Sequence, residues 1–392
     1  MTFANSFQPP TRILMGPGPS DVHQRVREAL ARPTIGHLDP EFIRLMDEIK
    51  AGLRRVFDTA NEMTLPISGP ASAGQEACIV NLLEPGDKAV ICINGVFGGR
   101  LQDMARRAGA EVVTVEQEWG RAVPPEALEE ALAANPDAKM AAFVHAETST
   151  GALSDARALA EVARRHDCLV LADTVTSLAG VPVRVDDWGL DIVYSGTQKC
   201  LSCPPGLSPV TFSPAAREAM AARRVPVQSW FLDLSLLTAY WGGEKRSYHH
   251  TAPVNALYGL HEALLMIDEE GLDAIWARHR RCHEALVAGL EAMGLSLAVP
   301  VAERVPQLNA VTVPEGVDEA EVRRRLLVDH NLEIGAGLGP MAGKIWRIGL
   351  MGQSATPRHV RYCLTSLESV LTAMGAPVNR GEAVAAVEAL GI

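Results

Sequence analysis

The chain has 392 residues, of which 47% are hydrophobic, so it is long and apolar enough to bury the core of two or three domains. Its formal net charge is -11 at pH 7. This acidic balance provides no basic field that would attract nucleic acid or an anionic membrane surface, and we expect neither as a partner.

The first 15 residues are expected to form an irregular N-terminal arm. No basic region followed by an apolar run occurs in residues 1–12, so this arm does not resemble a secretory signal. The arm leads into Gly-Pro-Gly-Pro-Ser at residues 16–20, a sequence typical of a loop. Apolar side chains then recur at three- and four-residue steps from Phe42 to Phe57, which indicates a helix with one buried face.

A large α/β domain is predicted over residues 16–266. Short apolar runs alternate there with amphipathic segments, which favours a largely parallel sheet covered by helices on both faces. The expected strands are residues 64–67, 89–93, 112–115, 140–144, 169–172 and 192–194, and the expected helices are 74–83, 101–108, 126–134 and 156–165. A further long helix should follow Pro253.

A smaller C-terminal α/β domain is predicted over residues 267–392. Its strands are expected at 308–313 and 345–348, and its helices at 318–327 and from Pro357 onward. No G-x-G-x-x-G opens the first strand–helix unit of the chain, and no G-x-x-x-x-G-K-[ST] occurs, so the usual nucleotide-binding loops are absent.

Two reactive side chains follow strands of the predicted parallel sheet, at the end where such sheets bind ligands. Asp173 ends one apolar run, where a carboxylate either caps a turn or keeps a pyridinium nitrogen protonated so that the ring accepts electrons. Lys199 follows the next strand among small residues. A lysine is usually a surface charge, but its amine becomes nucleophilic when burial favours the neutral form. Together the two residues favour a cofactor held as a Schiff base.

Two further positions suit anionic groups. Ser72 and Gln75 have the spacing of a capping box at the start of a helix, where free N–H groups either form an ordinary cap or bind a phosphate. Arg347 lies on a short strand of the smaller domain, either in a structural ion pair or positioned to hold a carboxylate with two parallel hydrogen bonds.

The cysteines predict a reducing environment. Seven cysteines in so long a chain do not form a disulfide scaffold, and we therefore expect a cytoplasmic protein. Cys200 and Cys203 form one C-x-x-C pair without a second ligand pair, so we expect no metal site; a redox pair is the lesser alternative. No stretch approaches the roughly 18 uncharged apolar residues of a membrane span.

These segments together resemble the class V, fold-type I aminotransferases that use pyridoxal 5'-phosphate (PLP), in particular the alanine–glyoxylate and serine–glyoxylate aminotransferases. The resemblance runs from residue 16 to about 375 and rests on segments 16–20, 83–87, 145–151, 195–199, 248–251 and 347–349. It implies a large PLP-binding domain with a mostly parallel sheet between helices, and a smaller C-terminal α/β domain.

The resemblance implies roles around the cofactor ring. Lys199 would bind PLP as an imine and later move the substrate proton, while Asp173 would pair with the pyridine nitrogen. Val175 would pack against one face of the ring and Phe97 would stack on the other, where some members of the family have tryptophan. Thr148 would bond the phenolic oxygen of the cofactor.

Other residues would bind the phosphate and the substrate. Ser72 and Gln198 are implied as phosphate ligands, joined by Tyr248 and Thr251 from the neighbouring subunit of a homodimer. Arg347 would hold the substrate carboxylate.

One segment departs from some relatives. They place Ser, Gly and His where this chain has Pro70, Ala71 and Ser72. Because proline has no N–H, this loop should donate fewer hydrogen bonds to a phosphate.

The resemblance implies transfer of an amino group from a small L-amino acid, alanine or serine, to glyoxylate, which yields glycine. Pyridoxamine–pyruvate and ureidoglycine–glyoxylate aminotransferases are the alternatives; the former carry an extra arginine where this chain has Leu338. A class V lyase such as a cysteine desulfurase is a remote alternative, because Gln198 stands where those enzymes have histidine and Cys363 lies in a helical pattern. A non-catalytic regulator would need a basic DNA-binding extension, and none is evident.

Overall fold

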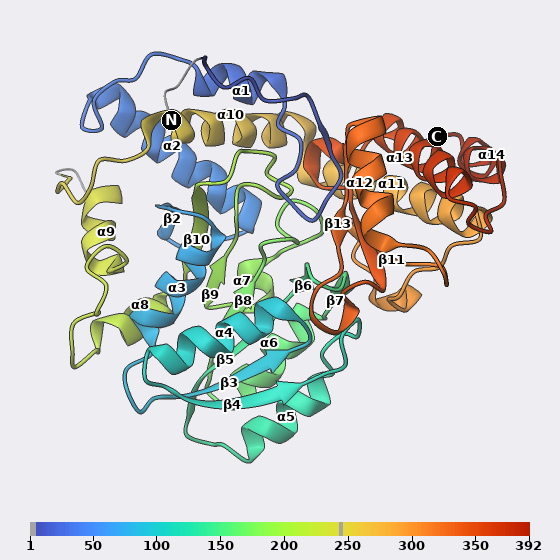
Figure 1. Ribbon diagram of the computed structural model, residues 1–392. Coiled ribbons are helices and arrows are strands. Elements are labelled where there is room, and N and C mark those ends of the chain that lie inside the picture. Colours follow the sequence, from blue (N-terminus) through green and yellow to red (C-terminus); the bar gives the residue numbers. More distant parts are fainter. Residues whose placement is uncertain (1–4, 243–245) are drawn as a thin grey trace.

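The computed structural model describes residues 5–242 and 246–392 (Figure 1). Residues 1–4 of the predicted arm and residues 243–245 lie outside the described residues. A seven-stranded sheet in the order β2-β10-β9-β8-β5-β3-β4 forms the middle of the larger part. Its strands are β2 (Met63–Ser68), β3 (Lys88–Ile93), β4 (Glu111–Glu116), β5 (Ala138–Val144), β8 (Leu169–Asp173), β9 (Ile192–Tyr194) and β10 (Leu207–Phe212).

The sheet is parallel except for one strand, which confirms the predicted α/β class. The six expected strands all form and share one direction, and β10 runs antiparallel between β2 and β9. Strands such as β5 and β8 are almost continuously apolar because helices bury both faces of the sheet. The sequence reading missed β10, where Ser208, Pro209 and Thr211 interrupt the apolar pattern and proline disfavours a central strand.

Helices cover this sheet and complete the larger part of the molecule. They are α1 (Gln24–Leu30), α2 (Pro40–Phe57), α3 (Ala71–Leu82), α4 (Val96–Arg107), α5 (Pro125–Ala133), α6 (Ala156–Arg165), α7 (Val185–Trp188), α8 (Pro214–Ala221), α9 (Leu234–Trp241) and α10 (Val254–Glu270). The amphipathic pattern of α2 is confirmed, since Phe42, Met46, Ile49 and Leu53 are fully buried. Helix α2 packs beside β2 and against α10, which also contacts α1. A short hairpin of β6 (Ala146–Glu147) and β7 (Ala152–Leu153) follows β5.

The C-terminal residues form a smaller α/β part with its own apolar core, drawn in orange and red in Figure 1. Strands β11 (Leu308–Thr312), β14 (Ile345–Gly349) and β13 (Gly335–Ala336) form an antiparallel sheet. Its helices are α11 (Leu272–Ala292), α12 (Glu319–His330), α13 (Pro357–Ala373) and α14 (Glu382–Ala389), with 3-10 turns η1 (Val301–Glu303), η2 (Gly339–Met341) and η3 (Gly352–Ser354). The division proposed from the sequence at residues 266/267 falls inside α10.

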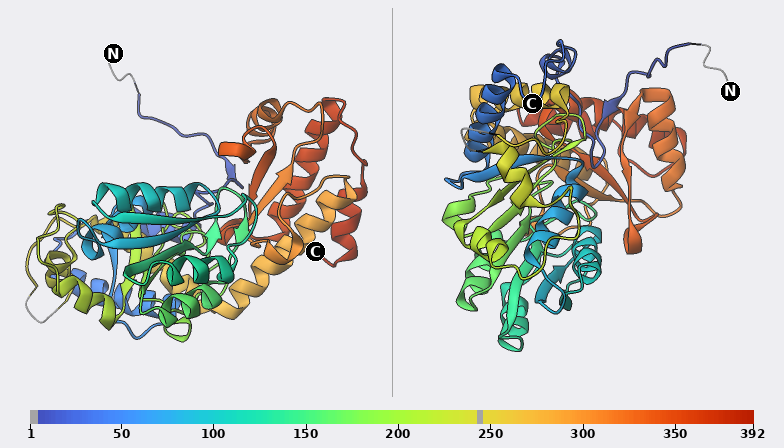
Figure 2. Two further views of the ribbon diagram at one scale, coloured as in Figure 1. Left: turned by 90° about the horizontal axis from the view of Figure 1, so that it is seen from below. Right: turned by 90° about the vertical axis from the view of Figure 1, so that its left-hand side faces the viewer.

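The N-terminal segment connects the two parts. Strand β1 (Ile13–Leu14) pairs in parallel with β12 (Leu332–Glu333) of the smaller part, and Figure 2 shows the preceding residues running away from the body. The N–H of Gly349 donates to the carbonyl of Met15 (2.7 Å). Within the described residues, no helix has both the length and the apolar character needed to cross a membrane.

Candidate active site

Asp173 is the last residue of β8, at the edge of the sheet where the parallel strands have their carboxyl ends. Its buried carboxyl accepts a hydrogen bond from the backbone N–H of Val175 (2.8 Å) and another from the hydroxyl of Tyr194. Burial raises the pKa of Asp173 to about 7, although both hydrogen bonds oppose this shift. A cationic partner in this dry position would therefore stabilise the ionised carboxylate.

Lys199 follows β9, the neighbour of β8 in the sheet, and its side chain is buried. Its Nζ donates to the carbonyl oxygen of Pro17. A Cβ added at Gly18, where φ is +98°, would lie 2.7 Å from Lys199 Nζ, so glycine lets the N-terminal segment pass this closely. Burial, reinforced by the positive charge of Arg347, lowers the pKa of Lys199 to about 8. The amine is thus closer to its neutral, nucleophilic form than an exposed lysine.

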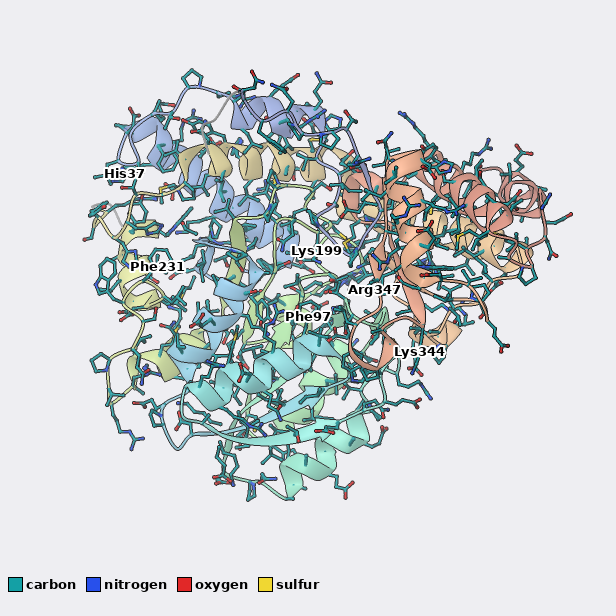
Figure 3. All side chains as sticks on the ribbon, viewed as in Figure 1. His37, Phe97, Lys199, Phe231, Lys344 and Arg347 are labelled. Atoms are coloured by element: carbon teal, nitrogen blue, oxygen red, sulfur yellow. The ribbon has the colours of Figure 1, made fainter. Side chains whose placement is uncertain are left out.

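Arg347 lies on β14 of the smaller part and reaches the edge of the large sheet. Figure 3 labels Arg347 in the middle of the view, and its positive charge acts on the amine of Lys199. Its Nε donates to the carbonyl of Ala336 (2.6 Å) and its Nη1 to the carbonyl of Thr148 (3.1 Å), while burial lowers its pKa to about 10. These bonds fix the guanidinium and leave Nη2 without a hydrogen bond among the described residues, so it is available to a carboxylate.

The start of α3 differs from the prediction. Pro70 is the N-cap and no side chain caps the helix, so the capping box expected from Ser72 and Gln75 is wrong. Ser72 is the second helical residue, and its Oγ accepts a hydrogen bond from Arg100 Nη1 (3.2 Å), whereas Gln75 donates to the carbonyl of Phe97 (3.4 Å). A proline N-cap provides no side-chain oxygen. The N–H of Ala73 donates to the carbonyl of Pro70 (2.7 Å), whereas the N–H groups of Ala71 and Ser72 make no hydrogen bond among the described residues and are available to an anion.

Gln198 lies beside this helix start. Its Oε1 is buried and has no hydrogen-bond partner among the described residues. A Cβ added at Gly196 would lie 2.7 Å from that oxygen and 2.9 Å from the Cβ of Ala71, which places the Gln198 amide near the first turn of α3. The structure therefore brings Ser72 and Gln198 to the same region.

Phe97 is the second residue of α4, where a buried carboxylate fixes its position. The N-cap, Gly95, has no side chain, and the Glu147 carboxylate accepts the N–H of Phe97 (3.2 Å). A Cβ at Gly95 would lie 2.4 Å from Glu147, so only glycine permits this approach. Burial raises the pKa of Glu147, and hydrogen bonds from Ser149 oppose the shift. The Phe97 ring remains half-buried beside the site.

Thr148 and Val175 are buried close to these groups. The hydroxyl of Thr148 bonds to that of Thr176, and its carbonyl accepts from Arg347. Val175 is 9% exposed, and its N–H bond to Asp173 ties its position to that of the carboxylate.

Tyr248 and Thr251 lie between α9 and α10. Tyr248 is 62% exposed, its ring centroid is 5.3 Å from that of His37, and its hydroxyl is 3.5 Å from that of Thr251. Figure 3 places His37 at the edge of the view, away from Lys199. Neither Tyr248 nor Thr251 is hydrogen-bonded to Ser72 or Gln198 in the described part of the chain. Both residues are exposed in the single chain.

Comparison with known proteins identifies the family. The sequence pattern of the family described as aminotransferase class-V matches residues 20–349. The chain belongs to this family. This class-V aminotransferase is 40% identical over 366 residues to the alanine–glyoxylate aminotransferase of Drosophila melanogaster, a match that covers 92% of this chain and 93% of the relative.

Two solved structures share the fold of this class-V aminotransferase. The alanine–glyoxylate aminotransferase of Nostoc sp. has a TM-score of 0.93 and 47% identity, with 94% of this chain and 98% of that chain covered. The ureidoglycine–glyoxylate aminotransferase of Bacillus subtilis has a TM-score of 0.96 and 38% identity, with 99% and 100% covered. The chain therefore has the fold-type I architecture expected from its motifs.

Sequence reasoning missed several residues that shape the site of this class-V aminotransferase. The sequence pattern predicts only that Tyr194 ends a strand, yet its hydroxyl bonds to Asp173. Glu147 had no assigned role, although it fixes the start of α4. Arg100, which contacts Phe97 and Ser72, also had no assigned role. It lies three residues after Phe97 on α4, and this spacing could have indicated that the two side chains share a helix face.

Proposed function

We propose that this protein is a PLP-dependent aminotransferase that moves an amino group from a small L-amino acid, alanine or serine, to glyoxylate, which yields glycine. The observation that carries the proposal is the convergence of Asp173, Lys199 and Arg347 at one edge of the large sheet. Burial shifts the pKa of all three side chains, as is common in active sites.

The residues of this edge fit PLP. The buried carboxyl of Asp173 has neutral hydrogen-bond donors as partners, which suits a protonated ring nitrogen. The Nε2 group of Gln198 makes no hydrogen bond among the described residues, so it can donate to a phosphate oxygen, which the acceptor Oε1 cannot do. The uncapped start of α3 would receive the phosphate, with Ser72 and Gln198 as ligands. Val175 and Phe97 would contact the ring, and Thr148 its phenolic oxygen.

When bound, PLP supplies an electron-accepting ring that stabilises negative charge on the substrate α-carbon. Asp173 would hold the proton on the ring nitrogen with its carboxylate. Lys199 would anchor the cofactor through Nζ and, once displaced by the substrate amine, would remove the proton from the substrate α-carbon and deliver it to the former aldehyde carbon of the cofactor. Arg347 would orient the substrate by pairing with its carboxylate.

The donor and the acceptor follow from the named relatives, of which the Drosophila melanogaster and Nostoc proteins are alanine–glyoxylate aminotransferases. Ureidoglycine–glyoxylate transfer is a second candidate, favoured by the fit to the Bacillus subtilis structure. Pyridoxamine–pyruvate transfer is less well supported because Leu338, between β13 and η2, lacks the charge of the arginine expected there.

A lyase reaction of the cysteine desulfurase type has less support. Such a reaction needs a mobile, reactive thiol, whereas Cys363 is fully buried inside α13. Burial raises the pKa of the Cys363 thiol to about 12, which keeps it protonated and unreactive.

We propose a homodimer with shared sites. Trp230, Phe231 and Tyr248 are 60%, 38% and 62% exposed in one chain, so a second copy would cover an aromatic surface there. It would also bring Tyr248 and Thr251 to the partner's phosphate.

We further propose a large domain of residues 16–266 and a smaller one of 267–392, preceded by the arm 1–15. The seven cysteines are free and buried, which supports a cytoplasmic location.

A half-reaction experiment tests the activity. Purified protein is mixed with single amino acids, and the absorbance of the lysine-bound cofactor is followed as it converts to the amine form. Alanine or serine should convert it, and glyoxylate should restore it more efficiently than pyruvate. Lys199→Ala should abolish the lysine-bound absorbance, while the exposed Lys344→Ala should not; unchanged absorbance and rate in Lys199→Ala would refute the proposal (Figure 3).

A further inference from the structure

Arg100 connects the two elements that begin beside the proposed cofactor site. It lies on α4, and its Nη1 donates to the hydroxyl oxygen of Ser72 on α3 (3.2 Å). Its guanidinium carbon is 4.9 Å from the ring centroid of Phe97, one helical turn earlier on the same face of α4. The side chain is therefore held between the ring of Phe97 and the first turn of α3.

The guanidinium of Arg100 lies at the start of α3, where a bound phosphate would need a positive charge. The ion pairs formed within residues 5–242 and 246–392 do not include Arg100, whereas Arg107, at the end of the same helix, pairs with Asp103. A phosphate at the start of α3 would bring negative charge, and the proline N-cap, Pro70, has no N–H to offer it. A guanidinium at this position would supply both charge and hydrogen bonds.

We propose that Arg100 is a direct ligand of the cofactor phosphate and takes over the donor function that Pro70 lacks. The proposal rests on the function proposed above. Because Ser72 accepts a hydrogen bond from Arg100, its own hydroxyl proton is free to point at a phosphate oxygen. The remaining N–H groups of the guanidinium can bond the same anion, and the contact with the Phe97 ring holds the guanidinium in this position.

A competing role for Arg100 is purely structural, as a support for the Phe97 ring. The two roles differ in which part of the cofactor they affect. Loss of a phosphate ligand weakens the binding of PLP but not that of pyridoxal, which has the same ring and aldehyde without the phosphate. Loss of support for Phe97 weakens the binding of both compounds to a similar extent.

The experiment compares dissociation constants of PLP and pyridoxal for wild type, Arg100→Gln, Arg100→Lys and the helix control Arg107→Gln. The holoenzyme is purified, the cofactor is removed, and each ligand is titrated back while its lysine-bound absorbance is recorded. Arg100→Gln should weaken PLP binding about 10- to 100-fold, the range for a lost charged hydrogen bond, and change pyridoxal binding less than about threefold. Arg100→Lys should recover part of the loss, and Arg107→Gln should match wild type.

Two results would overturn the inference. Equal weakening of PLP and pyridoxal by Arg100→Gln would assign Arg100 to support of Phe97, and unchanged binding of both would remove it from the site. Failure of the proposed function is distinguishable, because wild type itself would then show no lysine-bound absorbance with either ligand.

Discussion

The ionisation of Lys199 yields a quantitative prediction about how fast the cofactor-free protein captures an aldehyde. Only the neutral amine reacts, and burial lowers the pKa of Lys199 from 10.5 to about 8. At pH 7 the neutral fraction is then roughly 10%, against roughly 0.03% for an unperturbed lysine, a ratio of about 300. This advantage should shrink as pH rises from 8 and disappear above about pH 10.5, where both amines are neutral.

Rapid mixing of cofactor-free protein with PLP measures this effect. The rate constant is recorded between pH 6 and 11 and divided by that of Nα-acetyl-lysine, which keeps a free ε-amine, at the same pH; this removes the ionisations of PLP itself. Arg347→Gln should move the midpoint to higher pH, because Arg347 contributes to the lowered pKa of Lys199. A rate ratio that stays constant with pH would show that Lys199 is not desolvated and would refute the reasoning.

Three further predictions concern single substitutions. Arg347→Gln should raise KM for the amino acid about 100-fold while affecting kcat less, because a charged hydrogen bond from Nη2 to the substrate carboxylate is lost; steady-state kinetics with unchanged KM would contradict this role. Asp173→Asn should lower kcat, and it should also stabilise the cofactor-free protein at pH 8. The pKa of Asp173 is raised from 3.8 to about 7 in the folded state because its charged form is buried. Below pH 3.8 the carboxyl is protonated in both states and folding carries no ionisation penalty. As pH rises through 7 the carboxyl ionises, and the free energy of unfolding falls by up to about 4 kcal/mol. Urea unfolding at pH 5 and 8 should show a smaller pH difference in Asp173→Asn than in wild type. Trp346→Ala should destabilise the smaller part by about 3–5 kcal/mol, measured by urea unfolding, because Trp346 is fully buried; a cost below about 1 kcal/mol would contradict the packing.

The large sheet was predictable because its strands are encoded in local apolar runs between amphipathic helices. Strand β10 was not, because its polar residues and Pro209 carry no local strand signal, and its pairing with β2 depends on residues far apart in the chain. For the same reason the smaller part was predicted only in outline, and α14 was missed.

The ends of strands also made part of the site predictable. Asp173 and Lys199 were recognised because parallel strands carry their ligands at one end. The hydroxyl of Tyr194 and the carbonyl of Pro17, which contact these two side chains, are determined by tertiary packing that sequence spacing does not record. The roles of the site residues themselves remain predictions that the experiments above test.

The pairing of β1 with β12 bears on how the protein is made. The N–H of Ile13 bonds to the carbonyl of Asn331, and the same segment continues to Ser20, whose hydroxyl bonds to the carbonyl of Lys199. Since synthesis proceeds from the N-terminus, residues 13–20 leave the ribosome long before their partner strand exists. The pocket around the lysine can therefore close only late in synthesis, and a nascent chain that stops before β12 would carry an open, unfinished site.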